Sequence, residues 1–332
     1  MSEPRETGSE ELVLAFLAEA GDEFVPGEAI SDKLGLSRAA VWKHVETLRG
    51  HGYRIDAVPA RGYRLREIPD RLTALELRPL LATHDLGQVL HCFEELASTN
   101  DTARQLAEEG AAHGEVVIAE RQTAGRGRRG RGWISPPGRN LHLSAVLRPD
   151  LPPLRAPEIT LVASVGLCHA VRRAGADAGI KWPNDLVVGE RKLGGILTEM
   201  AAEADRVQWV VLGVGVNLNS RPEDFPEELR PAVTSVAAER GQPVPRALFA
   251  AAALALLEEW LDRYAEGGFA AVRDEWRVLS DTLGRQVRVA AEGREIRGLA
   301  EDVDESGALL VRTGGGRLEA VRSGEVVHLR AR

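Results

Sequence analysis

The sequence predicts an α+β protein in three parts, and three observations support this prediction. Residues 10–66 show helical patterns of apolar residues and then alternate as strands do. Residues 73–280 mix helical and strand patterns, which is typical of an α+β sheet domain. Residues 281–332 contain five short strand patterns separated by glycine turns, and so many strands in about fifty residues indicate a small β-barrel.

The N-terminal part begins with three predicted helices. Apolar residues recur at helical spacing over residues 10–20, Gly35 is placed to end a short second helix, and Ser37 is a good N-cap for a third. Residues 53–67 then alternate like two strands around a Pro-Ala-Arg-Gly turn. Two helices joined by a tight Gly-Leu-Ser turn and followed by a hairpin predict a winged helix-turn-helix.

The charge of this part differs from that of the whole chain. Residues 37–66 hold seven cations and two acids, whereas the chain has a net charge of −8. A basic helix and wing can neutralise DNA phosphates, so Ser37, Arg38, Lys43 and Arg61 are the predicted DNA-binding residues. The alternative is a three-helix interaction module with a solvated charged face. Charge, helix order and wing together favour DNA.

Composition limits the class of protein. An apolar fraction of 44% and a charged fraction of 28% are those of an ordinary soluble protein. Cys92 and Cys168 lie far apart without His or Cys at metal-ligand spacing, so neither a disulfide framework nor a zinc site is predicted. The acidic stretch 1–11 lacks the apolar core of a signal peptide, and we find no apolar run of the roughly 20 residues that span a bilayer. We expect a cytoplasmic protein without a membrane segment.

The stretch "AGRGRRGRGW", residues 124–133, is an arginine- and glycine-rich loop. Its first glycines spell G-x-G-x-x-G after a predicted strand, the pattern of a dinucleotide-binding turn. That turn requires a helix to begin within the motif, whereas "ISPPG" at 134–138 excludes one. Four guanidiniums on a flexible backbone instead predict a loop that an anionic ligand orders. An RNA-binding patch and a plain surface loop are the alternatives.

A second motif, "GIKWPNDL" at residues 179–186, ends a predicted strand. Lys181 is a candidate point charge for an anionic centre, and Lys192 downstream is another. The proline fixes the turn, so Asn184 and Asp185 point in defined directions. A turn of this kind can also be purely structural.

Two further motifs carry polar groups. In "ELASTND", Ser98 or Thr99 is expected to cap the helix that begins there, and the spare polar groups suit a neutral ligand head. In "GVGVNLN", Asn217 and Asn219 follow a buried strand, where ligand-facing loops tend to begin.

Taken together, the motifs resemble those of one family. They are STN (98–100), Q-x-x-G-R-G-R-x-G-R-x-W (122–133), KWPND (181–185), KLGGIL (192–197) and GxGxN (213–217). Their order and spacing are similar to those of biotin protein ligases. With "LSRAAVWKHV" at 36–45, the chain resembles the bifunctional members that also repress the biotin operon, from about Gly27 to its end.

The resemblance implies an activity, cofactors and partners. Members of the family join biotin to ATP, release pyrophosphate and retain biotinyl-5′-adenylate until a lysine of a biotin carboxyl carrier protein domain attacks it. The resemblance implies a central domain of the biotin/lipoyl ligase type and an SH3-like C-terminal barrel. It also implies Mg²⁺ with ATP, although we assign no metal ligand, and a ligand-promoted homodimer that binds operator DNA.

The resemblance also assigns roles to residues. The biotin-binding residues are expected to be Ser98, Thr99, Asn100, Gln122, Arg126, Gly127, Arg128 and Lys181. Lys181, Arg126 and Arg128 are the expected catalytic residues, because positive charge stabilises a carboxylate meeting an α-phosphate. The residues expected on the adenylate side are Trp133, Asn184, Lys192 and Asn217. Asp185 is a candidate acceptor for the proton of the attacking lysine.

Rival hypotheses share parts of this architecture. A lipoyl-protein ligase uses the same adenylate chemistry, but the arginine-rich loop and "KWPND" favour biotin. A regulator that binds biotin without transferring it would not need Arg126, Arg128 and Lys181. A ligase whose winged helix no longer represses is also open, since Trp42 could either pack on the wing or obstruct a DNA groove. The operator sequence and the carrier partner are not predicted.

Overall fold

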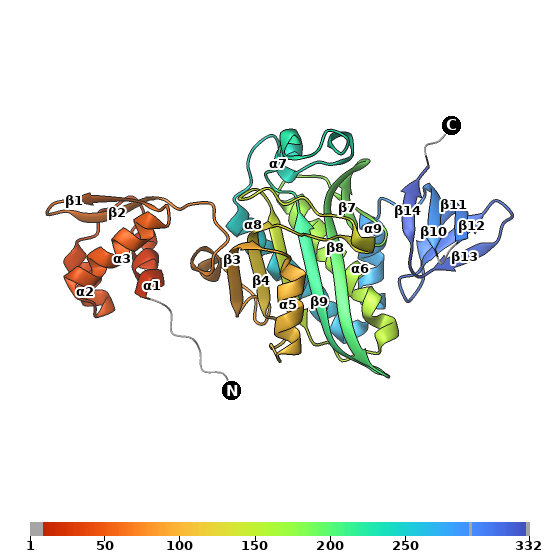
Figure 1. Cartoon of the computed structure of the whole chain (residues 1–332), viewed down its shortest axis with the longest axis horizontal. Coiled ribbons are helices and arrows are strands. Elements are labelled where there is room, and N and C mark those ends of the chain that lie inside the picture. Colours follow the sequence, from red (N-terminus) through yellow and green to blue (C-terminus); the bar gives the residue numbers. More distant parts are fainter. Residues whose placement is uncertain (1–8, 292–293, 330–332) are drawn as a thin grey trace. The chain divides into compact units, whose positions relative to one another are not determined.

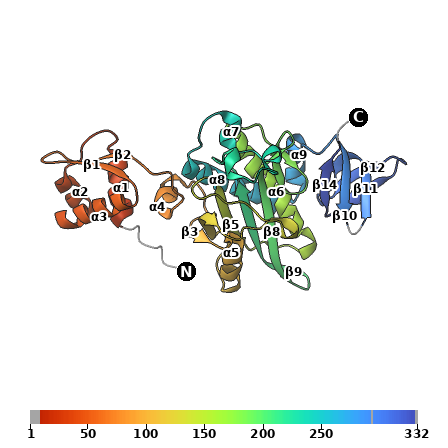
Figure 2. The same cartoon turned by 45° about the horizontal axis from the view of Figure 1, so that its top comes forward.

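The structure, a computed structural model, describes residues 9–291 and 294–329 (Figures 1 and 2). The chain divides into two units between Arg71 and Leu72. The first unit holds the N-terminal helices and hairpin. The second holds a large sheet with its helices and a smaller C-terminal sheet.

The first unit is a winged helix-turn-helix, as predicted. Its elements are α1 (Ser9–Glu19), α2 (Gly27–Leu34), α3 (Arg38–Gly50), β1 (Arg54–Val58) and β2 (Gly62–Glu67). Gly35 adopts a left-handed conformation (φ 66°) at the end of α2, and Ser37 Oγ accepts a hydrogen bond of 3.1 Å from Ala40 N at the start of α3. Both predicted caps are therefore confirmed, and each satisfies backbone groups that the helix ends leave free.

The wing is attached to the loop before α2. Tyr63 and Val25 exchange two backbone hydrogen bonds of 2.7 and 2.9 Å. Gly62 has φ +99°, and a Cβ built there would lie 2.0 Å from the Val25 carbonyl oxygen. Only glycine allows this close approach of the two backbones.

The second unit is built on a seven-stranded mixed sheet. Its strands and helices are α4 (Ala74–Leu77), β3 (Leu90–Leu96), α5 (Thr99–Glu108), β4 (Val116–Gln122), β5 (Leu141–Leu147), α6 (Ala156–Arg173), β6 (Gly179–Lys181), β7 (Asp185–Val188), β8 (Arg191–Glu203), β9 (Arg206–Val216), α7 (Val236–Arg240), α8 (Arg246–Gly267) and α9 (Ala270–Leu279). The strand order is β3-β4-β5-β9-β8-β7-β6, with β3 and β4 parallel and the other neighbours antiparallel. The turn between β7 and β8 contains Gly189 at φ 59°.

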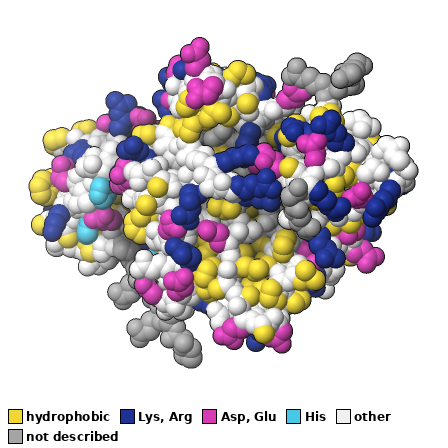
Figure 3. Space-filling view, turned by 45° about the vertical axis from the view of Figure 1, so that its right-hand side comes forward, with side chains coloured by type: hydrophobic (Ala, Val, Ile, Leu, Met, Phe, Trp, Pro, Cys, Tyr) yellow, Lys and Arg dark blue, Asp and Glu magenta, His cyan; other side chains and the backbone are white. Residues whose placement is uncertain are grey.

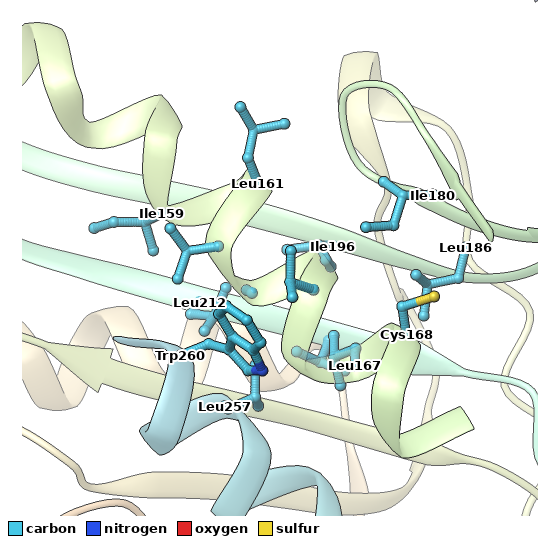
Figure 4. Packing of buried hydrophobic residues seen from close by; sticks show 14 of the residues in the cluster. Ile159, Leu161, Leu167, Cys168, Ile180, Leu186, Ile196, Leu212, Leu257 and Trp260 are labelled. Atoms are coloured by element: carbon cyan, nitrogen blue, oxygen red, sulfur yellow. The ribbon is translucent and has the colours of Figure 1, made fainter. Parts of the chain in front are cut away.

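Helices cover both faces of this sheet. On one face, α6 and α8 pack against the strands, and Leu167, Leu212 and Trp260 are among the buried side chains that meet there (Figure 4). On the other face, Ala103 and Ala107 of α5 pack in a smaller cluster of buried apolar residues. The helical segment Pro153–Arg173 is long and apolar enough to span a membrane, but 78% of its apolar window is buried, so it is a core helix of this fold.

The C-terminal part is a five-stranded antiparallel sheet. Its strands are β10 (Gln286–Ala291), β11 (Arg294–Val303), β12 (Leu309–Thr313), β13 (Leu318–Val321) and β14 (Glu325–His328), in the order β13-β12-β11-β10-β14. Trp182 ties it to the large sheet, because its indole N–H donates to the Gly307 carbonyl at 3.1 Å. The α+β fold class with these three parts is confirmed.

A buried ion pair links the large sheet to α8. Glu120 Oε2 lies 2.6 Å from Arg246 Nη1, and the Arg246 side chain is 1% exposed. Glu120 also accepts a 2.8 Å hydrogen bond from Leu72 N. One carboxylate therefore holds both α8 and the start of the second unit.

We predict that Arg246→Met destabilises the second unit by about 3–5 kcal/mol, because it leaves the Glu120 carboxylate buried without its counter-ion. Urea unfolding followed by tryptophan fluorescence measures this loss. The double variant Glu120→Leu/Arg246→Met should recover part of it, since no uncompensated charge remains. A single variant as stable as the parent would contradict the prediction.

Candidate active site

A cavity of about 320 Å³ lies in the second unit. Its lining includes every residue of this unit to which the family resemblance gives a ligand-binding role: Ser98, Thr99, Asn100, Gln122, Arg126, Gly127, Arg128, Trp133, Lys181, Asn184, Lys192 and Asn217. Residues from motifs separated by more than a hundred positions thus share one site. Figure 3 shows Lys and Arg side chains gathered on one face of the molecule, with Asp and Glu side chains beside them.

Neutral polar side chains form a connected group in the cavity wall. Gln122 Oε1 accepts hydrogen bonds from Thr99 N (2.8 Å) and Thr99 Oγ1 (3.0 Å). Ser144 Oγ lies 2.8 Å from Thr99 Oγ1 and 2.7 Å from Asn100 Oδ1. Asn100 Nδ2 donates to Glu199 at 2.7 Å. These bonds fix the directions of the groups before any ligand arrives, which lowers the entropy cost of binding.

The expected helix cap at this position is wrong. Ser98 occupies the N-cap position of α5, yet within the described part of the chain its hydroxyl makes no capping hydrogen bond. The Thr99 hydroxyl bonds to Gln122 instead. Ser98 and Thr99 both line the cavity, and Ser144 also bonds to the Thr99 hydroxyl.

Two glycines of β9 allow close approach from both sides of the cavity. A Cβ on Gly213 would lie 2.0 Å from Asn100 Oδ1, and one on Gly215 would lie 2.7 Å from the Trp133 ring. The glycines of the motif GxGxN are therefore required for steric reasons. Because it lacks a Cβ, Gly213 leaves room for the start of α5, and Gly215 leaves room for the end of the arginine-rich loop.

Arg126 anchors the arginine-rich loop to α5. Its guanidinium makes two hydrogen bonds to Asp101, of 3.0 and 2.6 Å, and lies 3.6 Å from Glu199. Hydrogen bonding to Asp101 raises the pKa of Arg126 above its ordinary value. The two-pronged geometry gives orientation as well as attraction.

The other arginines of the loop reach the C-terminal sheet. Arg128 Nη1 donates to Asn184 Oδ1 (3.1 Å) and to the Gly324 carbonyl (3.2 Å). Arg129 and Arg131 both pair with Glu325 of β14. Burial lowers the pKa of Arg128, whereas the hydrogen bond from Arg131 lowers that of Glu325. The C-terminal sheet thus forms one wall of the site.

The lysines of the site have different surroundings. Lys192 Nζ lies 2.7 Å from Asp185 Oδ1 and 5.7 Å from the centroid of the Trp133 ring. Lys181 is the last residue of β6 and lines the cavity. Burial, together with the nearby positive charge of Lys181, lowers the pKa of His328 to about 4. Because Asp185 already holds Lys192, its predicted role as a proton acceptor would require that pair to open.

The side chains of the asparagines after β9 are held by hydrogen bonds to the backbone of neighbouring loops. Asn217 is 3% exposed and donates to the Thr234 carbonyl at 3.0 Å. Asn219 exchanges hydrogen bonds with Val244 at 2.9 and 2.8 Å and does not belong to the cavity lining of the described chain. Phe225, Leu229 and Val233 supply an apolar part of the lining, which suits a flat heterocycle.

Sequence reasoning missed four residues that shape the site: Asp101, Ser144, Glu199 and Glu325. Ser144 left a signal, because it is a lone serine in the apolar run of β5 and its side chain is fully buried. No local sequence pattern distinguishes the three acids from acids that simply face solvent. Among the described residues, no three His, Cys, Asp or Glu side chains cluster as a metal site.

Comparison with known proteins agrees with this geometry. Residues 92–217 match the Biotin/lipoate A/B protein ligase family, residues 282–329 match the biotin protein ligase C-terminal domain, and residues 10–64 match an HTH domain. The fold and site define a protein ligase, and the chain belongs to the biotin protein ligase family.

The relatives extend over nearly the whole chain. The bifunctional ligase/repressor BirA of Bacillus subtilis is 40% identical over 313 residues, 94% of this chain and 96% of that protein. The protein of the same name from Escherichia coli is 35% identical over 89% of this chain and 90% of its own length. The structure of biotin protein ligase from Aquifex aeolicus in complex with biotin and ATP superposes with a TM-score of 0.63 at 28% identity, covering 73% of this chain and 99% of that one.

We predict that Gly213→Ala weakens biotin binding at least tenfold, because the added methyl group would displace Asn100 from its hydrogen bonds. Isothermal titration of the full chain with biotin measures the change. Gly315→Ala is the matched control, since a Cβ there meets nothing within 4 Å. Equal affinities for the two variants would contradict the account of the β9 glycines.

Proposed function

We propose that this chain ligates biotin to a biotin carboxyl carrier protein domain by way of biotinyl-5′-adenylate, and that the adenylate-bound form represses biotin synthesis genes. One observation supports the proposal most strongly. The cations Arg126, Arg128 and Lys181 line the same cavity as the neutral polar residues Thr99 and Asn100. A ligand with an uncharged polar head and a carboxylate matches these two kinds of wall.

The first half-reaction joins two anions. The biotin carboxylate attacks the α-phosphorus of ATP, the bond to the pyrophosphate oxygen breaks, and an acyl-adenylate forms. We assign Lys181, Arg126 and Arg128 to stabilise the charge that gathers on the carboxylate and phosphoryl oxygens. Mg²⁺ would accompany ATP and help to neutralise the charge of its phosphates.

Binding roles follow the lining. We assign Ser98, Thr99 and Asn100, with Gln122, to the ureido head of biotin, which needs both donors and acceptors. We assign Trp133, Asn184, Lys192 and Asn217 to the adenylate side, next to the apolar wall. We assign Gly127, which also lines the cavity, to biotin.

The second half-reaction transfers the acyl group. The neutral amine of the carrier lysine attacks the acyl carbon of the adenylate, AMP leaves with the bonding electrons, and the amine nitrogen gives up a proton to Asp185 or to water. Lys181 would again offset charge on the oxygens of the transition state. We further propose a cytoplasmic location, where ATP and carrier proteins are available, and a homodimer that the adenylate promotes.

We predict that Lys181→Met lowers the rate of biotin transfer about 10²–10³-fold, as removal of a transition-state charge partner does. ATP-dependent incorporation of biotin into a carrier domain measures it, and lipoate in place of biotin tests the rival lipoyl ligase. Lys33→Met in the first unit is the control and should leave the rate unchanged. A parent chain that incorporates no biotin, or that prefers lipoate, would contradict the proposed function.

We also predict that Arg126→Ala or Arg128→Ala weakens binding of operator DNA, although both residues lie outside the winged helix. Each loses a contact to the retained adenylate, and the adenylate promotes the dimer that presents two winged helices to a palindrome. Operator affinity under saturating biotin and ATP is the measurement. Affinity equal to that of the parent would refute this coupling.

A further inference from the structure

Phe24 lies in the loop between α1 and α2 and contacts two arginines of the wing. The guanidinium carbons of Arg61 and Arg64 are each 4.2 Å from the centroid of its ring. Phe24 is half-buried, whereas Arg61 is exposed in the turn between β1 and β2. Guanidinium groups stack on aromatic faces and remain fully charged there.

Most cations of the winged helix are already paired with acids. The pairs are Arg38–Glu28, Arg49–Glu46, Arg54–Glu67, and both Arg64 and Arg66 with Asp56. Among the residues that the structure describes, 9–291 and 294–329, no acid pairs with the other two cations of residues 37–66, Lys43 and Arg61. Arg61 thus has no acidic partner to neutralise its charge, and its guanidinium stacks on the ring of Phe24.

The backbone around this contact is held in place. The loop that carries Phe24 is bonded to the wing through the Val25–Tyr63 pair, and Gly62 fits against Val25 only because it lacks a Cβ. A long side chain on an exposed turn ordinarily loses much rotamer freedom when it binds a partner. The ring of Phe24 restricts Arg61 in advance without neutralising it.

We infer that Phe24 is a positioning residue for DNA binding, which holds the Arg61 guanidinium ready to contact a backbone phosphate of duplex DNA. This inference rests on the proposed repressor function and extends it to a residue that carries no charge. A phosphate contact is independent of base sequence, so the effect should appear with any duplex.

The experiment uses the full chain with saturating biotin and ATP. Its probe is a fluorescein-labelled duplex of mixed sequence, about 30 base pairs or roughly three helical turns long. Anisotropy titrations at several NaCl concentrations compare the parent with Phe24→Leu, Phe24→Tyr, Arg61→Ala and the double variant Phe24→Leu/Arg61→Ala. Phe93→Leu, in a half-exposed position of the second unit, is the matched control.

We expect Arg61→Ala to reduce the slope of log affinity against log salt by about one for each bound chain, and so by about two for the proposed homodimer, because each chain loses one phosphate contact. Phe24→Leu should weaken binding severalfold in the parent and leave affinity unchanged in the Arg61→Ala background. Phe24→Tyr, which keeps the aromatic face, should bind as the parent does. Phe93→Leu should have no effect.

Other results would overturn the inference. If Phe24→Leu weakens binding equally in both backgrounds, Phe24 supports the fold and does not act through Arg61. If it has no effect in the parent, the ring contributes nothing to binding. If the parent binds no duplex at any salt concentration, the proposed repressor function fails together with this inference, while the biotin-transfer assay stands apart.

Discussion

The ion pair between Arg126 and Asp101 is the interaction on which the site depends most. It joins the arginine-rich loop to the first turn of α5, where Thr99 and Asn100 stand. A glycine-rich backbone has many conformations to choose from, so a bidentate contact near its start removes much of that freedom. The position of the loop arginines is therefore fixed relative to the neutral side chains of Thr99 and Asn100.

The remaining contacts of the loop show how a site for anions exists without its ligand. Glu325 holds Arg129 and Arg131, and Asp185 holds Lys192. Glu325 lies on β14 and Asp185 lies on β7. These two acids keep the cations in place, and an anionic ligand can replace or supplement them as a partner. The C-terminal sheet takes part in this arrangement, which explains why it adjoins the ligase sheet.

The sequence was sufficient for features that depend on local chemistry. The caps at Ser37 and Gly35, the wing and the strands of the C-terminal sheet all follow from residue type and spacing. The dinucleotide-binding hypothesis was rightly rejected, since strand β5 and not a helix follows "ISPPG". In the same way, the order and spacing of the motifs that resemble those of the family predicted which residues would share the cavity.

Features that depend on long-range contacts were not predictable. Ser98 satisfies every local rule for an N-cap, yet it makes no capping hydrogen bond, and the neighbouring Thr99 hydroxyl bonds to Gln122 and Ser144, which other strands bring beside the helix. Asp101 and Glu325 look like solvated acids until the fold places arginines against them. Trp42 is 58% exposed on α3, so more than half of its surface faces solvent.

The cavity is proposed to make and retain an acyl-adenylate. Native mass spectrometry of the full chain, incubated with biotin, ATP and Mg²⁺, tests this property most directly. Each chain should carry one biotinyl-5′-adenylate. When a carrier domain is added, the adenylate should disappear and the carrier domain should become biotinylated. A chain that carries only unreacted biotin or ATP, or that releases the adenylate as fast as it forms, would contradict this proposal.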